Sequence, residues 1–113
     1  MTRIEHDRFE PFRTEVERRP DRVVVRACGE IDVSSVQHLR AQLFELVDSS
    51  ACVVLDLGAV CFIDSSGLHC LIEVDRASRA AGVGFALVPG APHVQRLFRL
   101  TGIDRTLRFI EQP

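Results

Sequence analysis

The sequence lacks lysine: all 14 of its basic residues are arginine. It also lacks a glycine-rich P-loop, so neither feature supports nucleotide binding, which stays an open alternative, and we expect no cofactor. No apolar stretch approaches the ~18 residues of a membrane-spanning helix. Residues 1–20 are heavily charged and contain no apolar core, which excludes a signal peptide. We therefore expect a cytoplasmic protein that does not insert into membranes.

Spacings typical of metal sites are missing too. The four cysteines, Cys28, Cys52, Cys61 and Cys70, form no CxxC pair, and the histidines do not cluster. We expect four reduced thiols without metal, and burial of Cys28 and Cys52 on strands. The net charge of −2 excludes a broad positive surface, and with it nucleic acid as a partner.

The composition that is present, 46% apolar and 27% charged residues, is typical of one globular domain. We assign residues 11–113 to this domain and residues 1–10 to a loose tail. β-Branched and alternating segments predict strands, and helical periodicity predicts helices. Strands are expected at 12–17, 22–29, 51–58 and 83–88, with a possible last strand at 106–110. Helices are expected after Ser34, after Asp64 and over 93–102.

The order of these elements is β-β-α-β-α-β-α, and strands joined through helices run parallel. This order predicts a single-domain α/β fold, a mostly parallel central sheet of four to five strands with helices packed on it. Ser34 is expected to cap the first helix, with Gln37 at the capping-box position. Gly82 should end the second helix in the left-handed conformation, and Leu100 is placed on the inward side of the third. The apolar stripe of the first helix consists of Val36, Leu39, Leu43, Leu46 and Val47.

A polar segment, DSSG at 64–67, separates two apolar runs where a strand feeds a helix. Ligands and partners of open α/β sheets usually bind at that edge. Asp64 is a good N-cap, which makes Ser65 the first helical residue and places Ser66 one position on. Glycine is unfavourable inside a helix, and no turn requires it at position 67. Gly67 therefore indicates close approach of another backbone or a ligand.

Ser65 could alternatively be a nucleophile, with His69 one helical turn away as its base. The surrounding residues do not form the GxSxG elbow of serine hydrolases. A base on the same turn rarely activates a serine, and no third group is evident to orient His69. We therefore expect no enzymatic activity, and expect His69 to be a surface residue.

Three segments taken together resemble a STAS domain, most closely the bacterial anti-sigma factor antagonists. They are GEID (29–32), VVLDLGAVCFIDSSGL (53–68) and HVQRLFRLTGIDRTLRF (93–109). The similarity runs from about Phe12 to Ile110, and DSSGL is its most specific part.

The resemblance implies a partner-switching protein of stress-response or sporulation pathways, which binds an anti-sigma factor with serine kinase activity and so releases a sigma factor. The kinase would inactivate this chain by phosphorylating Ser65, and a serine phosphatase would restore it. Asp32 matches a family position close to that serine. The implied partner surface consists of Asp32, Asp64, Ser65, Ser66, Gly67, Leu68 and His69, on a monomer or weak dimer. The alternative within the same fold is a regulatory or docking subunit of a membrane transport system, which the intact DSSGL disfavours.

Overall fold

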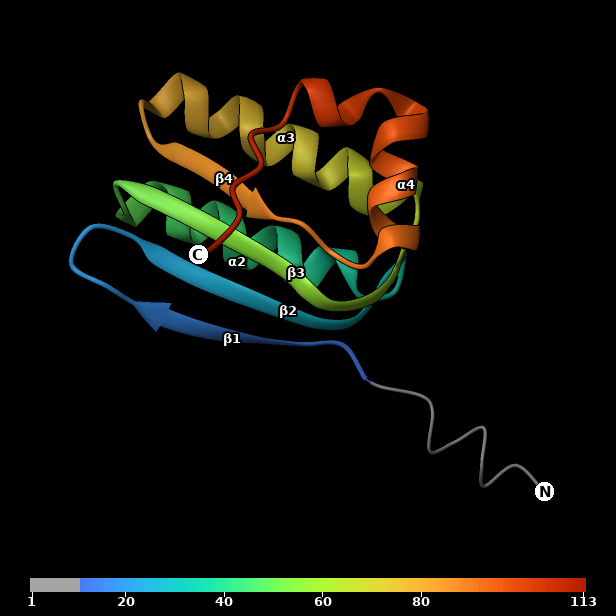
Figure 1. The fold of residues 1–113 in the computed structure, drawn as a ribbon. Helices are drawn as coiled ribbons and strands as arrows, with labels where there is room; N and C mark the ends of the chain where they lie inside the picture. The colour runs from blue at the N-terminus through green and yellow to red at the C-terminus, as the bar shows by residue number, and fades with distance from the viewer. Residues whose placement is uncertain (1–10) are drawn as a thin grey trace.

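A computed structural model describes residues 11–113; the tail predicted at 1–10 lies outside these described residues. Its elements follow the predicted order (Figure 1). The strands are β1 (Arg13–Arg18), β2 (Val23–Ile31), β3 (Cys52–Ile63) and β4 (Gly84–Val88). The helices are α2 (Val36–Ser49), α3 (Ser65–Ala81), α4 (Pro92–Thr101) and the 3₁₀ helix η1 (Ile103–Arg105).

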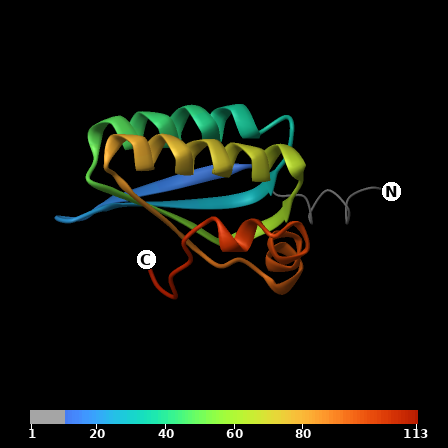
Figure 2. The same cartoon turned by 90° about the horizontal axis from the view of Figure 1, so that it is seen from above.

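The four strands form one sheet in the order β1-β2-β3-β4. β1 is antiparallel to β2, whereas β2, β3 and β4 run parallel. Figure 2 shows α2 and α3 side by side over one side of the sheet, and Val94 and Phe98 of α4 pack into the same core as the residues of these two helices. The mostly parallel four-stranded α/β sheet predicted from the sequence is therefore confirmed. Because the three parallel strands end at the same edge, the segments that follow them lie close together.

The core lies between the sheet and its helices. β-Branched residues fill the two central strands, where both faces of the sheet are covered; Val24, Val25, Val53 and Val54 are fully buried. The predicted stripe of α2 is confirmed, since all five of its residues are buried. Gly82 ends α3 with φ 71°, the left-handed conformation that was predicted.

Two sequence predictions near the C-terminus are wrong. Residues 106–110 form no strand of the sheet: the chain turns through Gly102 at φ 77°, enters η1, and meets β4 in a single bridge between Leu87 and Phe109. Leu100 is 70% exposed. The inward face of α4 is set by Val94 and Phe98, and a residue two positions after Phe98 points about 200° around the helix from it.

The cysteines follow the prediction only in part. No disulfide joins the four cysteines within residues 11–113, and Cys28 and Cys70 are buried. Cys52 is only half-buried because it is the first residue of β3, and Cys61 is exposed near the other end of that strand. Burial raises the pKa of the Cys70 thiol to about 11, so this thiol stays protonated at neutral pH.

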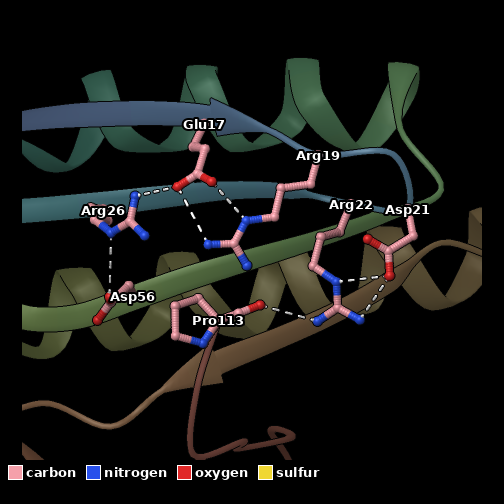
Figure 3. A network of polar contacts seen from close by, with 7 residues as sticks. All are labelled: Glu17, Arg19, Asp21, Arg22, Arg26, Asp56 and Pro113. Carbon is pink, nitrogen blue, oxygen red and sulfur yellow. Dashed lines mark hydrogen bonds and ion pairs between the residues drawn. The ribbon is translucent and has the colours of Figure 1, made fainter.

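A network of charged side chains covers the sheet face away from α2 and α3 (Figure 3). Glu17 accepts hydrogen bonds from Arg19 Nε at 2.8 Å and Arg26 Nη1 at 2.9 Å, and Arg26 Nε lies 3.8 Å from Asp56 Oδ2. The Arg19 and Arg26 guanidinium groups lower the pKa of Glu17 to about 2. Beside this network Arg22, the residue before β2, donates to the backbone carbonyl of Pro113.

Candidate functional site

The connections from β2 to α2 and from β3 to α3 lie side by side at the edge where the parallel strands end. Ile31 and Ile63 are partners in the β2–β3 register, and the Asp64 amide donates to the Ile31 carbonyl at 3.2 Å. From each isoleucine the chain continues with a similar pattern, Ile-Asp-Val-Ser-Ser at 31–35 and Ile-Asp-Ser-Ser-Gly at 63–67. The sheet therefore brings two related turns together, and the sequence analysis missed this similarity.

The second turn begins α3 as predicted, with Asp64 as its N-cap. The Asp64 carboxylate accepts from the Ser66 amide at 2.9 Å, the Gly67 amide at 3.2 Å and the Ser66 hydroxyl. These bonds satisfy two of the amides that a helix start leaves without partners. The first helical turn is thus held rigid without any contribution from the Ser65 side chain.

In the first turn the predicted cap is wrong. Asp32, and not Ser34, holds this turn: its carboxylate accepts from the Ser34 amide at 3.0 Å, the Ser34 hydroxyl at 2.7 Å and the Ser35 amide at 3.2 Å. A short carboxylate two residues before an amide forms this closed turn more readily than a serine can. The helix then starts at Val36, later than expected. The Ser34 hydroxyl lowers the pKa of Asp32, and the backbone amides of Ser34 and Ser35 add to the effect.

The two serines of DSSG differ in exposure and in hydrogen bonding. Ser65 is exposed, and within residues 11–113 its hydroxyl makes no hydrogen bond. Ser66 is half-buried, and its hydroxyl is bound to Asp64. The imidazole of His69 is 74% exposed and lies 3.9 Å from the Glu73 carboxylate, so it is a surface residue that pairs away from Ser65. Among the described residues of the site, Ser65 and His69 form no hydrogen bond with each other, so His69 is not placed as a base for Ser65.

Gly67 is required for packing against core side chains. A Cβ atom at this position would lie 2.7 Å from Cγ1 of Ile63 and 2.8 Å from Cγ2 of Ile31. The predicted close approach is therefore present, but the neighbours are two core isoleucines. The expectation of a backbone or ligand contact was wrong, because the spacing between β2 and β3 was not visible in the sequence. Leu68 is 4% exposed and packs in the same core as Ile31 and Ile63.

Two apolar side chains at this edge were not identified from the sequence. Val33, 76% exposed, follows Asp32, and Phe62, 45% exposed, precedes Ile63. Each adjoins one of the two turns in the sequence, where an exposed apolar group would add to a contact that covers the turns. The exposure of these side chains is hard to predict from the sequence. Phe62, for example, stands in an apolar run that resembles a buried strand.

Helix α3 is tied to α2 beside the site. Arg40 on α2 donates to Glu73 on α3 from Nε at 3.3 Å and Nη2 at 3.4 Å, and its guanidinium lies 4.8 Å from the centre of the Phe44 ring. The bond to Arg40 lowers the pKa of Glu73.

The described residues 11–113 contain no group of three His, Cys, Asp or Glu that could hold a metal ion. Among them, no helix is both long and apolar enough to cross a membrane.

Comparison with known proteins adds three kinds of similarity. The family model described as STAS domain matches residues 13–112. The anti-sigma F factor antagonist of Paenibacillus polymyxa is 30% identical over 95 residues, which cover 82% of this chain and 81% of that protein. The anti-sigma-B factor antagonist of Bacillus subtilis is 29% identical over 89 residues, covering 79% and 82%. The crystal structure of an anti-sigma factor antagonist from Mycobacterium paratuberculosis has a TM-score of 0.77 at 32% identity, covering 90% of this chain and 87% of that one.

Proposed function

This chain belongs to the STAS domain family, and from that premise we propose that it is an anti-sigma factor antagonist switched by phosphorylation of Ser65. In its unmodified form it binds an anti-sigma factor with serine kinase activity and thereby releases a sigma factor. Phosphorylation by that kinase ends binding, and a serine phosphatase restores it. The relatives are named as antagonists of anti-sigma factors, which supports a role as a cytoplasmic regulator without catalysis of its own.

The observation that carries the proposal is the contrast between two adjacent hydroxyls. Ser65 is exposed at the first position of a helix whose start is already capped by Asp64. Ser66 is bound to that cap. A kinase can therefore phosphorylate the Ser65 hydroxyl without breaking a hydrogen bond of the turn. Phosphorylation of Ser66 would instead break its hydrogen bond to Asp64.

A phosphate on Ser65 changes the charge of the edge more than it changes the fold. The γ-phosphoryl group of ATP passes to Ser65 Oγ, the hydroxyl proton passes to a base of the kinase, and ADP leaves. The product carries about −1.5 to −2 charge next to Asp64 and near Asp32. The positive end of the helix dipole accommodates this charge. A partner that fits the unmodified edge would instead meet crowded negative charge, so we expect affinity to fall while the structure persists.

The proposed contact surface consists of the exposed parts of the two turns. Asp32, Asp64, Ser65 and His69 supply polar groups, and Val33 adds an apolar one. Ser66, Gly67 and Leu68 position these groups from within the turn and core. Both carboxylates are held in fixed orientations by amide donors, so a partner meets a preorganised surface and loses little entropy in ordering it.

The proposal is tested with the anti-sigma factor encoded in the same genome. After incubation with kinase and ATP, mass spectrometry should place the phosphate on Ser65. Ser65→Ala should bind the kinase permanently, and Ser65→Asp should bind it poorly, although aspartate carries only about half the charge of a phosphate.

Ser66→Ala is the matched control, and it should still accept phosphate on Ser65. Circular dichroism of the phosphorylated and unmodified forms should coincide. Phosphate found mainly on Ser66, or unchanged affinity after modification of Ser65, would contradict the proposed switch.

A further inference from the structure

The arginines of this chain fall into two groups that differ in their partners. Residues 11–75 hold six arginines and eleven acidic residues, whereas residues 76–113 hold six arginines but only Asp104 and Glu111. In the first group every arginine except Arg18 forms an ion pair. In the second group, within the described residues, the one ion pair is Arg79 with Asp75. Within the described residues, the last third of the chain therefore has five arginines that form no ion pair.

Part of this charge gathers on the outer side of α4 and on η1. Arg96, Arg99 and Leu100 are all exposed, and Leu100 at 70% is among the most exposed large apolar residues of the described chain. Positions three and four apart are neighbours on a helix surface, so Arg96 borders both Arg99 and Leu100. Arg105 is exposed on η1 directly after the Gly102 turn. We call Arg96, Arg99, Leu100 and Arg105 the α4 surface.

The α4 surface lies at the same end of the molecule as Ser65. His93 in the first turn of α4 lies with Nε2 2.6 Å from the backbone oxygen of Cys61, three residues before Asp64. Figures 1 and 2 both show α4 at the end of the sheet where α3 begins. A large partner that covers the two turns would reach α4 as well.

Helix geometry favours a protein over a membrane or a nucleic acid as the occupant. The apolar residues that could enter a bilayer, Val94 and Phe98, are already buried in the core, so only Leu100 is left on the outer side. The neighbouring Asp32 and Asp64 carboxylates would repel both lipid phosphates and a nucleic-acid backbone. The dipole of α4 accounts for one arginine in its last turn, Arg99, but not for Arg96 or Leu100.

We propose that the α4 surface is a second docking site, which takes an acidic patch with an apolar contact on the anti-sigma factor. This inference rests on the proposed function, and it adds a contact that does not depend on Ser65. The partner would present positive or hydrogen-bond-donating groups to Asp32 and Asp64 and negative groups to α4. Such a dipolar arrangement fixes the orientation of the partner and accelerates its approach.

The test measures association and dissociation rates between the purified chain and its anti-sigma factor at about 0.02 M and about 0.5 M ionic strength. Arg96→Gln combined with Arg99→Gln should lower the association rate about 3- to 10-fold at low salt and less than about 2-fold at high salt. Leu100→Ser should raise the dissociation rate about 3- to 10-fold. The matched control is Arg13→Gln with Arg18→Gln, which removes the same charge from β1 at the far edge of the sheet.

Equal rate losses in both double variants, or none in either, would overturn the proposal. Binding of phosphatidylserine vesicles that disappears in the Arg96→Gln/Arg99→Gln variant would also overturn it, in favour of a membrane. If the wild-type chain binds no anti-sigma factor, the proposed function fails. The α4 surface is then tested by titrating ¹⁵N-labelled protein with a peptide of glutamate and leucine. Shifts confined to α4 and η1 would support the surface, and their absence would reject it.

Discussion

The turn at 31–35 and the turn at 63–67 use one hydrogen-bonding pattern for different purposes. In each, an aspartate carboxylate binds the amide and hydroxyl of the serine two residues on, and the amide after it. The residue between aspartate and serine is exposed in both: Val33 in the first turn, Ser65 in the second. The framework is thus set by the aspartate and serine, while the chemistry is set by the middle residue alone. One turn presents a permanent apolar contact and the other a hydroxyl whose charge can change.

The third residue after each aspartate explains why the helices start differently. Ser35 turns its hydroxyl inward and donates to the Glu30 carbonyl at 2.7 Å, and α2 starts only at Val36. Gly67 has no side chain, and the side chains of Ile31 and Ile63 occupy the space that its Cβ atom would need. α3 begins directly after Asp64, which places Ser65 at the first position of the helix.

Making the second turn like the first should have the largest effect. Ser65→Val reproduces the Val33 arrangement, and phosphate incorporation should fall to background because Ser66 stays bound to Asp64. Quantitative mass spectrometry after incubation with the kinase measures this loss. Val33→Ser in the same protein is the complementary test, since it creates an exposed hydroxyl in an equivalent frame. Transfer of phosphate to Ser66 in the Ser65→Val variant would show that the two hydroxyls are not distinguished by the cap.

Filling the space at Gly67 should have the next largest effect. Gly67→Ala places a methyl group within 3 Å of Ile31 and Ile63, and overpacking of this kind costs about 1–3 kcal/mol. Urea denaturation should therefore show a lower midpoint with an unchanged slope. Ser35→Ala at the corresponding position removes hydrogen bonds instead, at about 1 kcal/mol. A Gly67→Ala variant as stable as wild type would mean that the isoleucines can move aside.

Removing each aspartate tests whether the two turns are held in the same way. Asp64→Ala leaves the Ser66 and Gly67 amides without partners and should cost about 1–2 kcal/mol. Asp32→Ala should also lower the melting temperature, because Asp32 and not Ser34 closes its turn. Thermal unfolding followed by circular dichroism measures both. A stable Asp32→Ala variant that fails to bind the kinase would restrict Asp32 to partner contact.

The smallest expected effect is a pH dependence from Asp32. Its pKa in the native state lies below the ordinary 3.8, so ionised Asp32 stabilises the fold above that pH. The stabilisation is lost as pH falls through the lower native pKa. Asp32→Asn should therefore have a shallower fall in unfolding free energy below about pH 4 than wild type. Because Glu17 titrates in the same range in both proteins, the difference between the two curves reports Asp32; superimposable curves would contradict the assigned hydrogen bonds.

The sequence was sufficient where structure depends on neighbouring residues. The stripe of α2, the cap at Asp64 and the stop at Gly82 each follow from a few consecutive positions, and all were predicted. Prediction failed where distant segments meet. The reason for Gly67 lies in Ile31 on another strand, and the exposure of Leu100 depends on how Phe98 docks.

The candidate site follows this division only in part, because one error concerns a single local turn. The cap at Asp64 and the helix start at Ser65 were predicted correctly, because both belong to one turn. The closing role of Asp32 was assigned to Ser34 because the capping-box pattern with Gln37 was followed. The exposed Val33 and Phe62 were overlooked, since apolar residues at strand ends resemble core residues in a sequence.

The two edge strands of the sheet, β1 and β4, have different neighbours. This difference decides at which edge a strand of another chain could add to the sheet. Beside β4, Leu87 donates to the Arg108 carbonyl at 2.9 Å and accepts from the Ile110 amide at 2.8 Å, so the chain's own end occupies that border. Within residues 11–113, β1 has a strand neighbour on one side only. Its sequence, Arg-Thr-Glu-Val-Glu-Arg, sets charges along the open border. An incoming strand must match those charges in register, which discourages indiscriminate fibre growth from a sheet that can be extended in a single direction.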